Sequence, residues 1–158
     1  MRPEFNASLS HLELKDNRLH SLLELTNAIN ANLAIDQLYR IFTFIMKEQL
    51  NFSRFALLMA HEEWELAAKS GYKGKITATD LAQELQRFKD ITLVESSNSP
   101  QLKDFQAVIP IFHQDRALAF LLLATPGKTE FLEPQHFSFA QTLTNILSVA
   151  IENRRLTK

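Results

Sequence analysis

Apolar residues at three- and four-residue spacing predict two helices at the start of the chain. The first spans about residues 8–31, and the polar stretch Lys15–Asn17 within it indicates that its first half projects beyond the globular core. The second spans about residues 35–50. Asn30–Asn32 lies between the two apolar patterns and is the predicted break between the helices.

Two pairs of apolar segments then predict strand hairpins. Residues 55–60 are apolar at every position, which is typical of a central strand covered on both faces. Residues 64–69 alternate in character, as expected of its partner strand. Residues 107–113 and 117–124 form the second pair, and Pro110 predicts either an edge strand or a bulge there.

The segment between the hairpins, residues 75–106, has the least regular pattern. Thr79 is the predicted N-cap of a short helix over residues 80–88. A short apolar run predicts a strand over residues 91–94.

A final helix is predicted to begin near Pro134, because proline suits the first helical position. It carries two apolar stripes, whereas a helix packed on one sheet needs only one. The surplus predicts a second partner, either the first helix or another subunit. Neither glycine nor proline stops this helix before Lys158, so we expect residues 156–158 to begin a linker helix toward a further domain.

Composition and charge exclude several classes of protein. The chain of 158 residues is 46% hydrophobic and 22% charged, which fits one globular domain. Its net charge of −1 argues against a protein built to hold nucleic acid or an anionic membrane. The longest apolar run, Ala117–Ala124, is far shorter than the roughly 20 residues that span a bilayer. Without a signal-peptide pattern, we expect a cytoplasmic protein.

No motif in the sequence points to catalysis or to a metal. The absence of cysteine excludes a thiolate nucleophile, a cysteine-ligated metal and a thioether-linked chromophore. No two of the five histidines have the helical spacing of a metal clamp, and Ser70–Gly74 lacks the ending of a phosphate-binding loop. We therefore expect no catalytic residue, no metal and no cofactor, although an unknown small-molecule ligand remains open.

Four residues near the irregular middle segment are candidates for lining a ligand pocket. Phe88 and Phe105 border that segment, His113 ends an apolar strand, and Tyr72 lies among three lysines. Ordinary core packing is the alternative for the two phenylalanines, and a solvated loop is the alternative for the region of Tyr72.

The order of elements, and several blocks of sequence within it, resemble the GAF domain family. The resemblance covers about residues 20–155, and it accounts for Pro110 as part of an apolar-Pro-apolar block before a turn. The segments that carry it are Leu25–Ile29, Ile35–Leu38, Val108–Ile111, Ala117–Leu123 and Phe131–Glu133, followed by the closing helix to Asn153. It implies an α+β fold with a central antiparallel sheet of about five or six strands, and with the N- and C-terminal helices packed on one face. Residues 1–19 would be a helical extension.

Ser21–Asn30 and Gln141–Arg154 also resemble the N-terminal regulatory region of bacterial SpoIIE/RsbU-type protein serine/threonine phosphatases. In those proteins a GAF-like region precedes a metal-dependent phosphatase domain, whose aspartate-rich motifs are absent from this sequence. The resemblance implies a non-catalytic regulatory module with a covalently linked effector domain downstream. The residue set of the cyclic-nucleotide-binding GAF domains is not reproduced, so no ligand is carried over.

The sequence thus predicts a sensory module that forms a homodimer through its end helices and controls a downstream serine/threonine phosphatase domain. The candidate dimer residues are Leu22, Leu25, Ile29, Leu143, Leu147 and Ile151. A pure dimerisation module without a ligand and a small stand-alone cytosolic enzyme are the alternatives. PAS-like and roadblock-like folds are alternative architectures, and the two opening helices favour the GAF-like fold over the PAS-like one.

Overall fold

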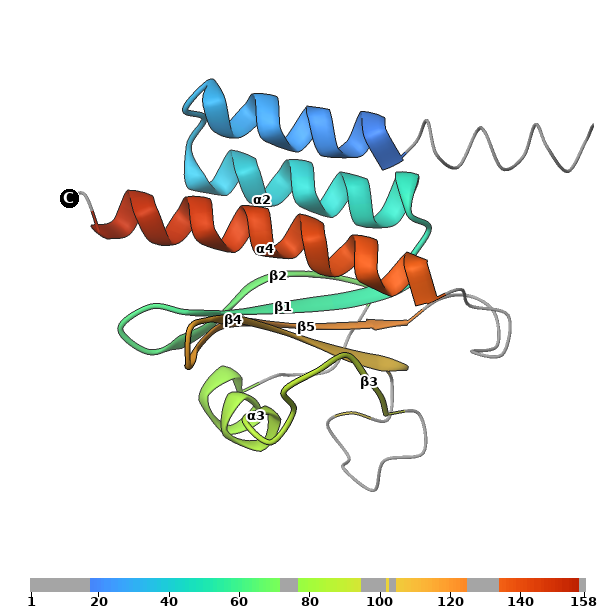
Figure 1. Ribbon diagram of the computed structural model, residues 1–158, viewed down its shortest axis with the longest axis vertical. Coiled ribbons are helices and arrows are strands. Elements are labelled where there is room, and N and C mark those ends of the chain that lie inside the picture. The colour runs from blue at the N-terminus through green and yellow to red at the C-terminus, as the bar shows by residue number, and fades with distance from the viewer. Residues whose placement is uncertain (1–17, 72–76, 95–101, 103–104, 125–133, 157–158) are drawn as a thin grey trace, which may run out of the picture.

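The computed structural model describes residues 18–71, 77–94, 102, 105–124 and 134–156, and its centre is a five-stranded antiparallel sheet (Figure 1). The strand order is β2-β1-β5-β4-β3. The α+β fold class expected from the sequence is therefore confirmed. The strands are β1 (Arg54–Ala60), β2 (Trp64–Ser70), β3 (Thr92–Leu93), β4 (Ala107–His113) and β5 (Arg116–Ala124).

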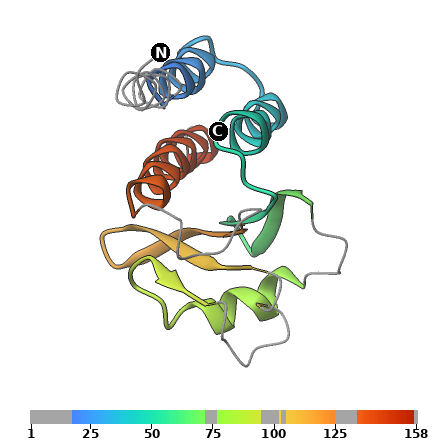
Figure 2. The ribbon, with the colours of Figure 1, turned by 90° about the vertical axis from the view of Figure 1, so that its right-hand side faces the viewer.

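Helices cover both faces of this sheet, but unequally. Helices α2 (Ile35–Phe44) and α4 (Pro134–Leu156) lie against one face, and a helix over residues 18–30 lies on top of those two (Figures 1 and 2). The opposite face is covered by the short helix α3 (Ala78–Leu85). The N- and C-terminal helices thus share one face, as the sequence predicted.

Strand β1 divides the hydrophobic core into two clusters. Because successive side chains of a strand point to opposite faces, Phe55 and Leu57 join the cluster beneath the long helices, while Ala56 and Leu58 join the cluster beneath α3. All four are fully buried. The prediction of a central strand covered on both faces is confirmed, since β1 lies between β2 and β5 and its side chains enter both clusters.

Pro110 lies on a part of β4 that has a paired strand on one side only. The pairing of β4 with β5 skips Leu118, so the bulge is on β5, whereas Pro110 itself pairs regularly with Phe120. The predicted bulge is therefore not at Pro110. The short β3 pairs only with Val108 and Ala107, and so leaves β4 beyond Val108 without a neighbour among the described strands. Proline is tolerated there because no strand requires its missing N–H.

Two predicted helices differ in detail from the structure. The N-cap of α3 is Thr77 rather than Thr79. The helix ends at Leu85, and the backbone hydrogen bonds that follow link residues three apart instead of four. The second predicted helix consists of α2 and a π-helical turn, η1 (Ile45–Gln49), in which the Leu50 amide bonds the Ile45 carbonyl. The break after the first helix is confirmed by Asn32, which adopts a left-handed φ of 59°.

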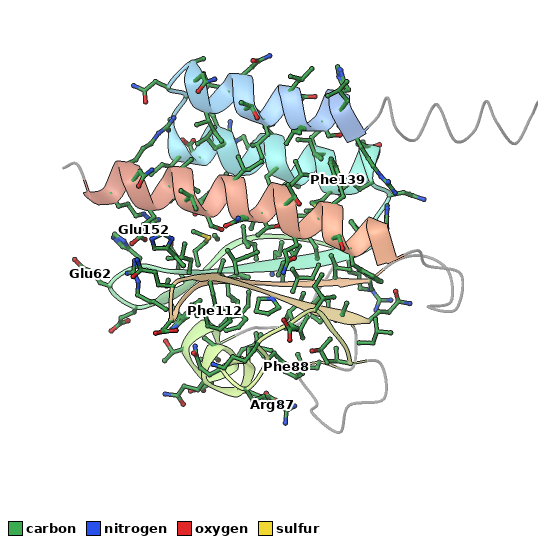
Figure 3. The ribbon with its side chains drawn as sticks, viewed as in Figure 1. Glu62, Arg87, Phe88, Phe112, Phe139 and Glu152 are labelled. Atoms are coloured by element: carbon green, nitrogen blue, oxygen red, sulfur yellow. The ribbon has the colours of Figure 1, made fainter. Side chains whose placement is uncertain are left out.

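The second apolar stripe of α4 finds a partner within the chain. Leu143 and Leu147 share one buried cluster with Leu25 of the first helix. The Arg18 guanidinium lies 6.0 Å from the centre of the Phe139 ring, on the side of α4 turned away from the sheet (Figure 3). No helix in the described residues is long and apolar enough to cross a membrane.

Candidate functional site

Aromatic side chains gather on the sheet face that α3 covers. The Phe120 ring on β5 lies 5.3 Å from the Trp64 ring on β2 and 6.4 Å from the Phe112 ring on β4, the latter edge to face. Three strands therefore contribute to one aromatic surface. Such pairs stabilise a core beyond their area of burial.

Two cations lie over the rim of this aromatic surface. The Arg87 guanidinium is 4.7 Å from the centre of the Phe88 ring, and Lys89 Nζ is 4.9 Å from that of Phe112. Figure 3 places Arg87, Phe88 and Phe112 together below the sheet. The Lys89 contact joins the segment after α3 to strand β4, whereas Arg87 and Phe88 are neighbours within that segment.

The structure brings together two of the four pocket residues predicted from the sequence. Phe105 is 1% exposed, and Phe88 is partly buried against the same cluster. His113 is exposed at the end of β4, apart from that cluster. Tyr72 lies outside the described residues. The assignment of these residues to a ligand pocket stays a prediction.

The six predicted dimer residues lie in the cluster between the long helices and the sheet. Leu25, Leu143, Leu147 and Ile151 are completely buried within one chain, and Leu22 and Ile29 pack partly against them. A second copy would therefore meet other side chains first. Sequence reasoning did not single out Leu19 and Leu23, whose side chains are about half exposed and whose four-residue spacing was the available signal.

The last turns of α4 are bonded to three separate parts of the fold. Glu152 pairs with Arg116 of β5 at 2.6 Å, and Arg155 pairs with Glu65 of β2 at 2.7 Å. Arg154 donates to two backbone carbonyls: that of Ile29, near the end of the first helix, and that of Leu33, just after this helix. A displacement of any of these segments would therefore change the hydrogen bonds and ion pairs at the end of α4.

Tyr39 of α2 is a second residue that the sequence did not single out. Burial raises the pKa of Tyr39 to about 12, an effect that Arg155 opposes and Glu65 reinforces. The phenol is therefore a neutral donor at physiological pH. Its position could not be read from the sequence, because Tyr39, Glu65 and Arg155 come from three distant elements.

A small polar hollow of about 150 Å³ lies between β4 and α4. Gln141 lines it, and its side-chain amide donates to the Pro110 carbonyl at 3.3 Å. Within the described ranges, no group of three histidine, aspartate or glutamate side chains is placed to hold a metal ion.

No family model and no curated protein matches the sequence. Solved structures do match the fold. The GAF domain of a phosphoenolpyruvate-protein phosphotransferase from Coxiella burnetii has a TM-score of 0.69 at 20% identity, over 89% of this chain and 96% of that one. The corresponding GAF domain from Acinetobacter has a TM-score of 0.68 at 16% identity, over the same shares of the two chains. The chain has the GAF fold.

The GAF fold is found in proteins with different partners. The phycoerythrobilin-bound GAF domain from a cyanobacterial phytochrome also matches, with a TM-score of 0.63 at 16% identity over 90% of this chain and 98% of that one. That domain carries a bilin, whereas the Coxiella and Acinetobacter domains belong to phosphotransferases. Identities this low establish the fold alone, so the predicted link to a serine/threonine phosphatase stays a prediction.

Proposed function

We propose that this chain is a non-catalytic sensory and regulatory module of signal transduction. A small molecule would bind on the α3 face, and α4 would carry the resulting change to a covalently linked effector domain. The resemblance in the sequence favours a protein serine/threonine phosphatase domain as that effector. GAF domains among the structural neighbours occur in phosphotransferases and in a phytochrome, which supports a role in signalling.

The observation that carries this proposal is the set of bonds at the end of α4. Arg154 contacts the segment after the first helix, and Arg155 and Glu152 contact two strands. A ligand that binds one arrangement of the α3 face better shifts the population toward it. Because the strands that carry the aromatic surface also hold the end of α4, such a shift would reach α4, the helix proposed to connect to the effector domain.

A homodimer forms part of the proposal. Leu19 and Leu23 expose apolar surface on the helix that covers α2 and α4, and that helix forms the outer layer of the molecule (Figure 2). Burial of this surface against a second copy would leave the buried cluster beneath it intact. A Leu19→Glu/Leu23→Glu double variant is therefore expected to be monomeric while its far-ultraviolet circular dichroism stays unchanged.

Native mass spectrometry of the chain purified from cells tests the sensory role. A dimer with a reproducible additional mass is the expected result, and the mass would begin to identify the ligand. A bare dimer would favour an assembly module, the second candidate function, for which the close packing of Phe105 in the α3-face cluster is the supporting observation. A bare monomer would contradict the dimer.

The relay is tested by hydrogen exchange of an Arg154→Met variant. Loss of the bonds to Leu33 and Ile29 should speed amide exchange about tenfold in residues 31–34 and in the last turn of α4, since one such bond contributes about 1.4 kcal/mol. The control is Arg40→Met, which removes an arginine that is 80% exposed. Equal exchange in the two variants would count against the relay.

A further inference from the structure

A groove of about 380 Å³ runs between helix α2 and the edge strand β2, on the sheet face opposite α3. Its volume is within the range of small-molecule sites. The residues that line it are Asp36, Tyr39, Arg40, Thr43, Ala67, Ala68 and Lys69. The groove is separate from the aromatic surface of the proposed sensory site, because the sheet lies between them.

The groove owes its depth to a bulge in β2. The pairing of β1 with β2 skips Ala67, so that Leu57 faces Ala68 and Leu58 faces Leu66. As a result, Ala67 and Ala68 both pack toward the long helices instead of pointing to opposite faces. Two methyl groups fill little of the space below α2, and among the described strands none covers the outer edge of β2.

Two buried hydrogen-bond donors lie beside this groove. The Tyr39 hydroxyl, on the groove wall, interacts with the Arg155 side chain, and neither it nor Arg155 Nη1 has an acceptor outside that pair among the described residues. The neighbouring nitrogen of the same guanidinium, Nη2, is already bonded to Glu65. Phenol and guanidinium can share one bond, but the phenol proton then still needs an acceptor. Buried donors without acceptors are costly, and an oxygen bound between them would remove this cost.

The charges around the groove favour an anion. Arg40, Lys69 and Arg155 are cationic, whereas Asp36 and Glu65 are acidic. Each acid is already engaged by an arginine, Asp36 by Arg40 at 3.9 Å and Glu65 by Arg155. The remaining charge in the groove is therefore positive.

We infer that this groove is a second binding site, which takes a small molecule with a carboxylate and a compact apolar body. One carboxylate oxygen accepts from the Tyr39 hydroxyl and from Arg155 Nη1. The apolar body lies against Ala67, Ala68 and the Tyr39 ring. Since the two donors are shielded from solvent, hydrogen bonds to them are stronger than the same bonds at the surface.

Benzoate and its neutral analogue benzamide test this inference on the full 158-residue chain. Amide ¹H–¹⁵N spectra recorded during titration should show saturable shifts at Tyr39, Ala67 and Ala68 with benzoate. Benzamide has the same shape but no charge, so it should bind at least tenfold more weakly, as expected when a charged hydrogen bond is lost.

Three variants locate the interaction. Tyr39→Phe removes only the hydroxyl, and it should weaken benzoate binding about tenfold. Ala68→Leu fills the groove and should abolish binding, with circular dichroism to verify that the variant folds. Lys89→Met removes a cation on the opposite face of the sheet, and should leave binding unchanged.

Three results would overturn the inference. Equal binding of benzoate and benzamide would show that the two donors do not recognise charge. Unchanged benzoate binding by Tyr39→Phe would place the ligand elsewhere. Absence of any saturable shift would mean that water alone satisfies the two donors. None of these results bears on the α3 face, so the proposed sensory role is tested separately.

Discussion

The two faces of the sheet are built in different ways. One is buried by a first helix, α2 and the 23-residue α4, whose buried side chains form the larger of the two clusters. The other is covered by the eight-residue α3. Segments with few buried contacts open at lower free energy than the core. The face buried by the long helices, called the platform below, is therefore expected to be the more stable one. The face covered by α3, called the adjustable face, is expected to open more easily.

The largest expected effect is on the platform. Phe55→Ala removes a fully buried ring that meets Phe42 edge to face at 5.9 Å. The lost contacts and the cavity left behind should lower the free energy of unfolding by about 4 kcal/mol, as measured by urea denaturation. Phe44→Ala is the matched control, because its ring is 50% exposed, and it should cost less than about 1 kcal/mol. Similar losses in both variants would contradict the assignment of Phe55 to the platform.

The platform was also the part that the sequence predicted best. Long apolar stripes specify which side of a helix is buried, and the uniformly apolar run of β1 indicated cover on both faces. The short elements around α3 were placed less well, because an eight-residue helix contains too few periods to define its ends. Thr77 and Thr79 both suit an N-cap, and only the fold distinguishes them.

The candidate sites were predictable only in part, for a different reason. Phe88 and Phe105 could be proposed because they flank an irregular segment, and they do meet in one cluster. Tyr39 and Arg155 meet only through the packing of α2, β2 and α4, and the hollow beside them depends on a bulge at Ala67. Neither relation leaves a pattern in the sequence.

The next largest effect is expected at Gly71, where the chain leaves β2. Gly71 has a φ of +71°, and a Cβ atom there would lie 2.0 Å from the backbone oxygen of Ser53. Gly71→Ala should therefore destabilise the fold by about 2–3 kcal/mol, since the obstructing atom is backbone. Thermal unfolding measures this. Gln114→Ala, at another residue with positive φ, is the control, and should change stability by less than about 1 kcal/mol. If Gly71→Ala left the stability unchanged, the backbone at Gly71 and the backbone at Ser53 would have to move apart at little cost.

A smaller effect is expected on the adjustable face. Phe88→Ala removes a ring that is only partly buried and that contacts Arg87, so the global loss should be about 1 kcal/mol. Amide exchange should accelerate in α3 while that of α2 and α4 is unchanged. A loss as large as that of Phe55→Ala, with uniform acceleration, would show that the two faces unfold as one unit.

The smallest effect returns to the platform and concerns alkaline pH. Burial raises the pKa of Tyr39 from 10.0 to about 12, so between these values the unfolded chain releases a proton that the folded chain retains. The contribution of Tyr39 is therefore fully present below pH 10 and is lost as the pH rises toward 12. Because the side chain is only partly buried, we expect the loss to be at most about 1 kcal/mol. Urea midpoints at pH 9 to 11.5 should fall less steeply for Tyr39→Phe than for the parent chain. Parallel pH profiles would mean that the hydroxyl is solvated, which would also weaken the case for a carboxylate beside it.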